Sequence, residues 1–160
     1  MIEKAIDYLK LEKDDHVLDL FCGLGNFSLP MAQECAHVTG VEGSVDMIKK
    51  ARENAAKNDI DNIDFVQADL YDEKMFSAPW LKKKYNKILL DPPRSGASVI
   101  MKHLEKMNAK IIVYVSCHPA TLARDANILV NELGYTLRDA GILDMFPHTA
   151  HVESMAVFVK

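Results

Sequence analysis

The stretch "VLDLFCGLGNFSLPMA" (residues 17–32) decides the fold of this 160-residue chain. It opens as an apolar run, turns at Gly23 and Gly25 and continues at helical spacing, which is typical of a strand, a glycine turn and a helix. Such a turn lets a ligand approach the backbone closely at the carboxyl end of a strand. A dinucleotide-binding G-x-G-x-x-G motif would have its third glycine at Ser28, so this turn favours a ligand without a pyrophosphate.

The rest of the chain alternates apolar runs with stretches of helical period, which predicts an α/β fold with helices on both faces of a mostly parallel sheet. We expect seven strands, near 16–21, 37–42, 62–66, 86–91, 110–116, 135–143 and 152–158. We expect helices near 2–10, 26–34, 44–58, 97–107 and 119–132. No helix separates the last two strands, so they are predicted to form an edge hairpin with an antiparallel last strand. Seven strands fit a methyltransferase sheet better than a six-stranded dinucleotide-binding domain.

Composition predicts a single domain spanning 1–160, which is long enough to bury one core. No apolar run approaches the roughly 20 residues of a membrane helix, and the start of the chain lacks the layout of a secretion signal, so the cytoplasm is the expected compartment. Three cysteines without a C-x-x-C pair indicate neither a disulfide framework nor a metal site. A net charge of −4 gives no overall field to attract nucleic acid, so any RNA substrate needs a local patch or another domain.

Acidic residues end the second and third predicted strands. Glu42 is placed to accept hydrogen bonds from both ribose hydroxyls of a nucleoside, and Asp69 could accept from an adenine amino group. Together with the glycine turn, these residues indicate binding of S-adenosylmethionine (SAM). The alternative is that the two acids cap the following helices or face solvent.

The stretch "ILLDPPRSGA" (88–97) ends the fourth predicted strand with Asp91 and two prolines. The prolines fix a rigid extended turn beside which a planar substrate could bind. Methyltransferases that act on exocyclic amino groups have an aromatic residue after the prolines, but here Arg94 follows, so amino methylation lacks its stacking platform. The alternative interpretation of the motif is a surface turn.

Cys117 ends the fifth predicted strand in "YVSCHP" (114–119). Carbon 5 of a pyrimidine is a poor nucleophile, and a thiolate that adds to carbon 6 activates it. The helix that opens at Pro119 would favour the thiolate form. Cys117 is therefore a candidate nucleophile, although a small buried packing residue is the alternative.

A base must then remove the proton from carbon 5, and "HTAHVESM" (148–155) supplies His148, His151 and Glu153 near the start of the last strand. Glu153 is the candidate base, because a carboxylate that is desolvated there would take up a proton more readily. The two histidines could instead be hydrogen-bonded residues of a loop.

Four segments of the chain resemble, in order, the motifs of the RNA 5-methyluridine methyltransferases: "LDLFCGLGNFSLPMA", "LLDPPRSGA", "VYVSCHPATLARD" and "MFPHTAHVESM". The resemblance implies the SAM-dependent Rossmann-like fold, with Cys117 as nucleophile and Glu153 as base. It also implies the SAM contacts Phe21, Asn26, Glu42, Asp69 and Asp91, to which we add Gly23 and Gly25 of the turn. For the substrate we expect contacts from Pro92, Arg94 and His148.

The expected function is SAM-dependent methylation of uridine carbon 5 in structured RNA, with ribosomal RNA favoured over transfer RNA and with no metal. Members of the resembled family carry an upstream RNA-binding domain, often with an iron–sulfur cluster, so we expect such a domain in the full-length protein and read this chain as the catalytic domain. One alternative is a SAM-binding domain without independent activity. Another is methylation of cytosine carbon 5, whose enzymes usually have proline directly before the nucleophile, where this chain has Ser116.

Overall fold

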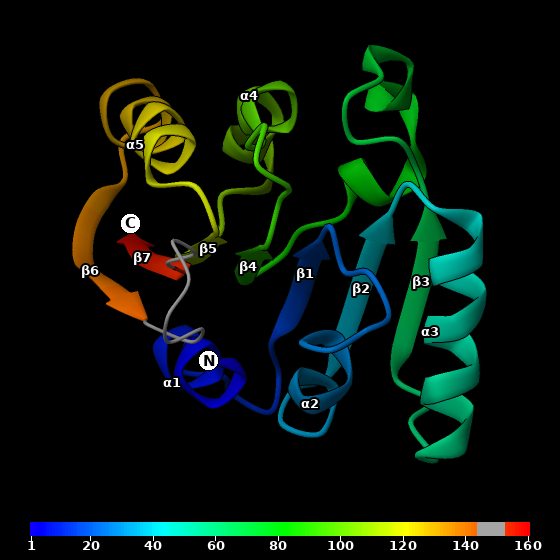
Figure 1. Ribbon diagram of the computed structural model, residues 1–160. Helices are drawn as coiled ribbons and strands as arrows, with labels where there is room; N and C mark the ends of the chain where they lie inside the picture. Colours follow the sequence, from blue (N-terminus) through cyan, green and yellow to red (C-terminus); the bar gives the residue numbers. More distant parts are fainter. Residues whose placement is uncertain (144–152) are drawn as a thin grey trace, which may run out of the picture.

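The computed structural model describes residues 1–143 and 153–160, and in it seven strands form one sheet in the order β3-β2-β1-β4-β5-β7-β6 (Figure 1). β7 runs antiparallel to both of its neighbours, and all other neighbouring pairs are parallel. The predicted α/β class with an antiparallel last strand is therefore confirmed. The strands are β1 (His16–Leu20), β2 (His37–Glu42), β3 (Ile63–Gln67), β4 (Lys87–Leu90), β5 (Ile111–Ser116), β6 (Thr136–Leu143) and β7 (Glu153–Val159).

Helices cover both faces of the sheet (Figure 1). α1 and α2 pack against residues such as Val17 and Val113 on one face, where α3 packs on Phe65. α4 and α5 pack against Leu18 and Tyr114 on the other face. The α-helices are α1 (Ile2–Leu9), α2 (Ser28–Ala32), α3 (Val45–Lys57), α4 (Ser98–Met107) and α5 (Pro119–Asn127), and α5 continues into a π-helical turn, η3 (Ile128–Glu132).

The central strands are buried on both faces, because helices lie above and below them. All six residues of β5 are buried, and its odd and even positions enter different hydrophobic clusters. This explains why the sequence shows an uninterrupted apolar run there and not an alternation of apolar and polar residues.

Two predicted segments differ from the structure in detail. The helix expected from residue 26 begins at Ser28, because the preceding residues form the turn in which Gly25 has a φ of +87°. The connection before β4 holds two short 3-10 helices, η1 (Glu73–Ser77) and η2 (Pro79–Lys82). Asp72 caps η1 by accepting from the Lys74 amide, and Pro79 begins η2. The capping residue and the proline therefore account for two short helices in a segment whose sequence shows no helical spacing of apolar residues.

β6 and β7 pair antiparallel, as the predicted hairpin requires, with a bulge between Leu137 and Asp139. β7 lies between β5 and β6, so the last strand of the chain is an interior strand of the sheet and β6 is the edge. This order brings the beginning of β7 next to the end of β5.

A buried polar pair joins β1, which precedes the glycine turn, to α2, which follows it. The Ser28 hydroxyl donates a short hydrogen bond to the Asp19 carboxyl group, and both residues are fully buried. Burial is the main reason why the pKa of Asp19 is raised to about 7. The hydrogen bond from Ser28 opposes this rise, and the charge of Asp91 adds to it. Asp19 therefore keeps its proton in the folded protein at pH values where an exposed aspartate is ionised.

This buried acid predicts a pH dependence of stability. Between about pH 4 and 7 the unfolded Asp19 has lost its proton and the folded one retains it, so the free energy of unfolding falls as the pH rises, by on the order of 1 kcal/mol per pH unit. Asp19→Asn has no group to ionise, and its stability should fall less over this window. Urea denaturation of both proteins across this range measures the difference, and parallel curves would contradict the prediction.

Candidate functional site

A cavity of about 350 Å³ lies at the carboxyl ends of β1, β2, β3 and β4. Five of the residues predicted to bind the cofactor line it, although they come from four different segments of the chain. The lining residues are Phe21, Gly23, Glu42, Gly43, Met47, Asp69, Leu70, Tyr71, Asp91 and Pro93. The cavity therefore combines three carboxylates with apolar and aromatic walls.

The glycine turn after β1 forms one side of the cavity. Phe21 and Gly23 both have positive φ, of +65° and +53°, and both face the cavity. Gly25 is buried behind the turn, where an added Cβ would lie 3.2 Å from the Phe65 ring, and Asn26 is exposed. Neither Gly25 nor Asn26 is among the residues that line the cavity, so their contact with a cofactor stays a prediction.

The two strand-end acids hold the loops around them while they face the cavity. Glu42 accepts hydrogen bonds from the Gly23 amide at 3.2 Å and from the Ser44 amide at 2.9 Å. Asp69 accepts from the Tyr71 amide at 2.9 Å. A carboxylate can accept about four hydrogen bonds, so both acids retain capacity for the hydroxyl or amino groups of a ligand. The helices that follow are capped by other residues, α3 by Ser44 and η1 by Asp72, so the alternative that Glu42 and Asp69 cap these helices is not supported.

Asp91 follows β4 on the opposite side of the cavity. Its amide donates to the Leu20 carbonyl at 3.3 Å, which fixes its backbone to β1. Burial, together with the charge of Glu153, raises the pKa of Asp91 to about 6. Asp91 and Glu153 therefore act on one another electrostatically although 62 residues separate them in the sequence.

The register between β5 and β7 brings Cys117 and Glu153 together. Ser116 pairs with Ser154, and the Ser154 hydroxyl donates to the Ser116 carbonyl at 3.1 Å. Extending this antiparallel register by one residue sets Cys117 opposite Glu153. Both side chains are half-buried. A thiol and a carboxylate thus share the strand end next to Asp91.

Cys117 differs from the other two cysteines in its surroundings. Cys22 and Cys35 are buried in the hydrophobic core. Burial raises the pKa of both thiols, that of Cys35 to about 11, so they remain protonated at neutral pH. Cys117 is free and half-buried, and it precedes the first turn of α5, which begins with Pro119.

The residues predicted to contact the substrate are only partly described. Pro92 is buried, and Arg94 is exposed in the turn between Asp91 and Ser95. His148 lies outside the described residues, as does His151. Arg94 directly follows Pro93, which lines the cavity, and the contributions of Arg94 and of the histidines to substrate binding stay predictions.

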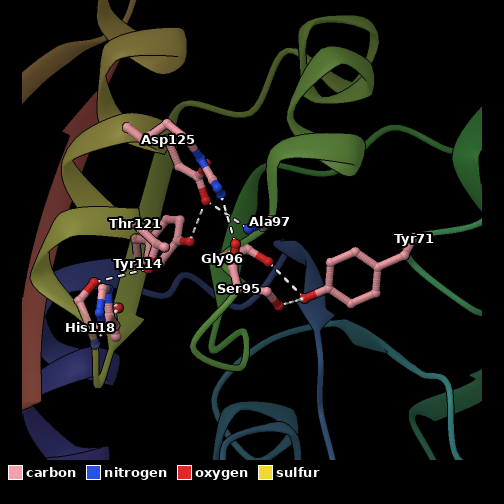
Figure 2. A network of polar contacts seen from close by, with 10 residues as sticks. Tyr71, Ser95, Gly96, Ala97, Tyr114, His118, Thr121 and Asp125 are labelled. Atoms are coloured by element: carbon pink, nitrogen blue, oxygen red, sulfur yellow. Dashed lines mark hydrogen bonds and ion pairs between the residues drawn. The ribbon is translucent and has the colours of Figure 1, made fainter.

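Sequence reasoning missed five lining residues, which are Gly43, Met47, Leu70, Tyr71 and Pro93. The Tyr71 ring lies against Phe21 with a centroid distance of 5.8 Å, and its hydroxyl donates to the Gly96 carbonyl at 2.7 Å (Figure 2). Its position two residues after Asp69 was the available signal, since residues that directly follow a parallel strand lie at the same edge of the sheet.

Within the described part of the chain, no cluster of three or more histidine, cysteine, aspartate or glutamate residues could hold a metal ion. No helix among these residues is long and apolar enough to cross a membrane.

The arrangement suits a ligand with a positive charge, hydroxyl groups and an apolar ring. Glu42, Asp69 and Asp91 supply negative charge and hydrogen-bond acceptors, while Phe21 and Tyr71 offer aromatic surface. SAM has this combination, with a sulfonium centre, a ribose and an adenine. The lining residues therefore fit SAM, and Cys117 and Glu153 lie at the neighbouring strand end.

Comparison with known proteins gives a consistent result. A family model described as tRNA (uracil-5-)-methyltransferase matches residues 1–160. Proteins named 23S rRNA (uracil(1939)-C(5))-methyltransferase RlmD from Stenotrophomonas maltophilia (strain K279a) and Haemophilus parainfluenzae (strain T3T1) are 55% and 52% identical over 160 residues. Each alignment covers the whole of this chain, and the chain spans 36% of the length of these relatives.

Solved structures share the fold. The tRNA (uracil-54, C5)-methyltransferase of Pyrococcus abyssi, solved in complex with S-adenosyl-L-homocysteine, is 33% identical with a TM-score of 0.81, and the match covers 99% of this chain and 37% of that one. A precorrin-6y C5,15-methyltransferase from Geobacter metallireducens matches with a TM-score of 0.80 at 14% identity over 99% of this chain and 88% of that one, which shows a shared fold alone. Because the family model matches every residue, this chain belongs to the tRNA (uracil-5-)-methyltransferase family.

Proposed function

We propose that this chain carries out the SAM-dependent methylation of uridine carbon 5 in RNA, with Cys117 as nucleophile and Glu153 as base. The observation that supports the proposal is the β5–β7 register, which pairs Ser116 with Ser154 and, continued by one residue, sets the half-buried Cys117 opposite Glu153 near an acidic cavity. Ribosomal RNA is the proposed substrate, because relatives more than 50% identical are named as 23S rRNA uracil-C5 methyltransferases.

The proposed mechanism begins with the thiolate of Cys117. Its sulfur adds to carbon 6 of the uracil, and the electrons of the double bond between carbons 5 and 6 move toward carbon 5 and the carbonyl group at carbon 4. Bound SAM supplies an electrophilic methyl group. Carbon 5 takes this group as the bond between the methyl carbon and the sulfonium breaks, which leaves carbon 5 with both a methyl group and a proton.

Glu153 completes the proposed cycle. Its carboxylate removes the proton from carbon 5, the double bond between carbons 5 and 6 re-forms, and the bond from carbon 6 to the Cys117 sulfur breaks. The neighbouring Asp91 lies close enough to Glu153 for the charge of Glu153 to help raise the pKa of Asp91, so the proposed base lies beside the cofactor cavity that Asp91 lines. The nucleophile and base therefore act in different steps of one reaction.

A second candidate is that the chain binds SAM but does not methylate RNA by itself. It rests on the net charge of −4 and on the chain's span of 36% of its relatives' length. Phosphate contacts supply much of the affinity of proteins for RNA, and an acidic chain offers few of them.

The cofactor site predicts a cost for losing Glu42. Glu42→Ala should weaken SAM binding by about 1–3 kcal/mol, because it removes charge-assisted hydrogen bonds to the ribose. Glu42→Gln retains one acceptor oxygen and should lie between the alanine variant and the wild type. Isothermal titration calorimetry measures the affinities, with Glu34→Ala, an exposed acid outside the cavity, as the control. An unchanged affinity in Glu42→Ala would refute the placement of the ribose.

Covalent catalysis predicts different products from the two catalytic variants. Glu153→Gln in the intact protein should transfer the methyl group but fail to release the cysteine, so a methylated adduct accumulates as a slow-migrating, RNA-dependent band on a denaturing gel. Cys117→Ala and the double variant should give no such band and no methylation. Cys35→Ala, which removes a buried thiol of the core, is the matched control and should behave as the wild type. Methylation by Cys117→Ala at a near-normal rate would show that Cys117 is a packing residue and not the nucleophile.

The second candidate also has a direct test. Residues 1–160 alone should methylate a short RNA hairpin slowly or not at all, and the same residues joined to the remaining part of the Stenotrophomonas maltophilia relative should be far more active. A radiolabelled methyl-transfer assay compares the two proteins at equal concentration. Robust turnover by residues 1–160 alone would exclude the need for further RNA contacts.

A further inference from the structure

The two halves of the turn that follows β4 are held in place by different contacts. Asp91 at its start is fixed to β1 by a backbone hydrogen bond, and the adjacent Pro92 is buried. The second half, from Arg94 to Ala97, lies beyond the sheet, so side chains of other elements must hold it. Figure 2 shows these contacts, which reach the turn from α5 on one side and from Tyr71 on the other.

Asp125 of α5 is the centre of the contacts on the α5 side (Figure 2). Its side chain is fully buried, and its Oδ2 atom accepts from the Ala97 amide and from the Tyr114 hydroxyl, both at 2.6 Å. Its Oδ1 atom accepts from Nε of Arg124 at 2.9 Å. A buried carboxylate is tolerated when every oxygen is hydrogen-bonded, and here one of the donors is the backbone of the turn.

Arg124 and Gly96 tighten this contact. Nη2 of Arg124 donates to the Ser95 carbonyl at 2.9 Å, so the guanidinium group joins the turn to Asp125. Gly96 has a φ of +76°, and an added Cβ would lie 2.4 Å from Nη2 of Arg124 and 2.7 Å from Oδ2 of Asp125. Close packing as well as backbone conformation therefore requires glycine at this position.

The turn is also tied to the wall of the cofactor cavity. The Tyr71 hydroxyl donates to the Gly96 carbonyl at 2.7 Å and lies 2.8 Å from the Ser95 hydroxyl (Figure 2). The Tyr71 ring lines the cavity beside Phe21. Two sets of contacts thus hold residues 95–97. The set from α5, which begins two residues after Cys117, binds Ser95 and Ala97, and the set from the cavity wall binds Ser95 and Gly96.

We propose that Asp125 is a positioning residue, which holds the Arg94–Ala97 half of the turn in the conformation that receives the RNA substrate. It acts through the Ala97 amide and through Arg124, and it touches neither SAM nor the reacting atoms. The proposal rests on the proposed function. Because Asp91 is anchored separately by β1, loss of Asp125 should disturb the RNA step and leave SAM binding intact.

Four variants of the intact protein test this role. Asp125→Ala removes the acceptor, Asp125→Asn keeps one oxygen for the Ala97 amide, and Arg124→Gln removes the half-exposed guanidinium group that donates to Ser95. Tyr114→Phe is the matched control, because it removes a buried hydrogen bond of Asp125 but leaves both contacts with the turn. The measurements are hydrogen exchange of residues 92–98, calorimetry with SAM, and kcat/KM for RNA.

Asp125→Ala and Arg124→Gln should exchange faster in residues 92–98 and lose about 10-fold to 100-fold in kcat/KM for RNA, with SAM affinity unchanged within about twofold. Asp125→Asn should recover part of both losses. Tyr114→Phe should unfold at a lower temperature and yet match the wild type in the exchange of residues 92–98 and in kcat/KM for RNA. If Asp125→Ala does not fold, Arg124→Gln provides the test of the proposal, because the Arg124 side chain that it replaces is half-exposed.

The proposal would be overturned if residues 92–98 of Arg124→Gln and Asp125→Ala exchanged at the wild-type rate. It would also be overturned if Tyr114→Phe changed exchange and kcat/KM as much as these two variants do. Absence of methylation by the wild-type protein would instead contradict the proposed function. Hydrogen exchange is measured without RNA, so it tests whether Asp125 fixes the turn whether or not the wild-type protein methylates RNA.

Discussion

Parallel strand pairing is the constraint on which the site depends. Because β1 to β5 run in the same direction, the residues that follow each strand lie along one edge of the sheet, and acidic and aromatic side chains from distant parts of the chain meet there. A strand can bring its first residue to that edge only by running in the opposite direction. β7 does so, and Glu153 therefore arrives beside Cys117.

The acidic edge has opposite consequences for the two substrates. Carboxylates of Glu42, Asp69 and Asp91 attract a cationic methyl donor, and the raised pKa of Asp91 shows how strongly burial disfavours its charge. The same carboxylates repel phosphate groups. Under the proposed function, a target uracil therefore has to reach this edge with its own phosphates held away from it, which is compatible with a base that is turned out of its helix.

Much of this arrangement was predictable from the sequence, because it follows from periodicity and from strand ends. The seven strands follow from the apolar runs, and the antiparallel last strand follows from the absence of a helical stretch before it. The meeting of Glu42, Asp69 and Asp91 follows from their places at the ends of parallel strands. Contacts between side chains far apart in the chain were not predictable. Asp125 lies between Leu122 and Leu129 on the buried face of its helix, so a charge at a core position was the signal, but nothing local indicates that its partner is the amide of Ala97.

The place of β7 in the sheet has a consequence for how the protein is made. Among the described strands β6 pairs only with β7, and β7 fills the position beside β5, although it follows β6 in the sequence. During translation the parallel half of the sheet can form early, whereas β5 and β6 remain without a shared neighbour until β7 has been made. The proposed nucleophile therefore acquires its proposed base only after β7 has joined the sheet, and a nascent chain that stops before β7 would have the cofactor cavity without Glu153.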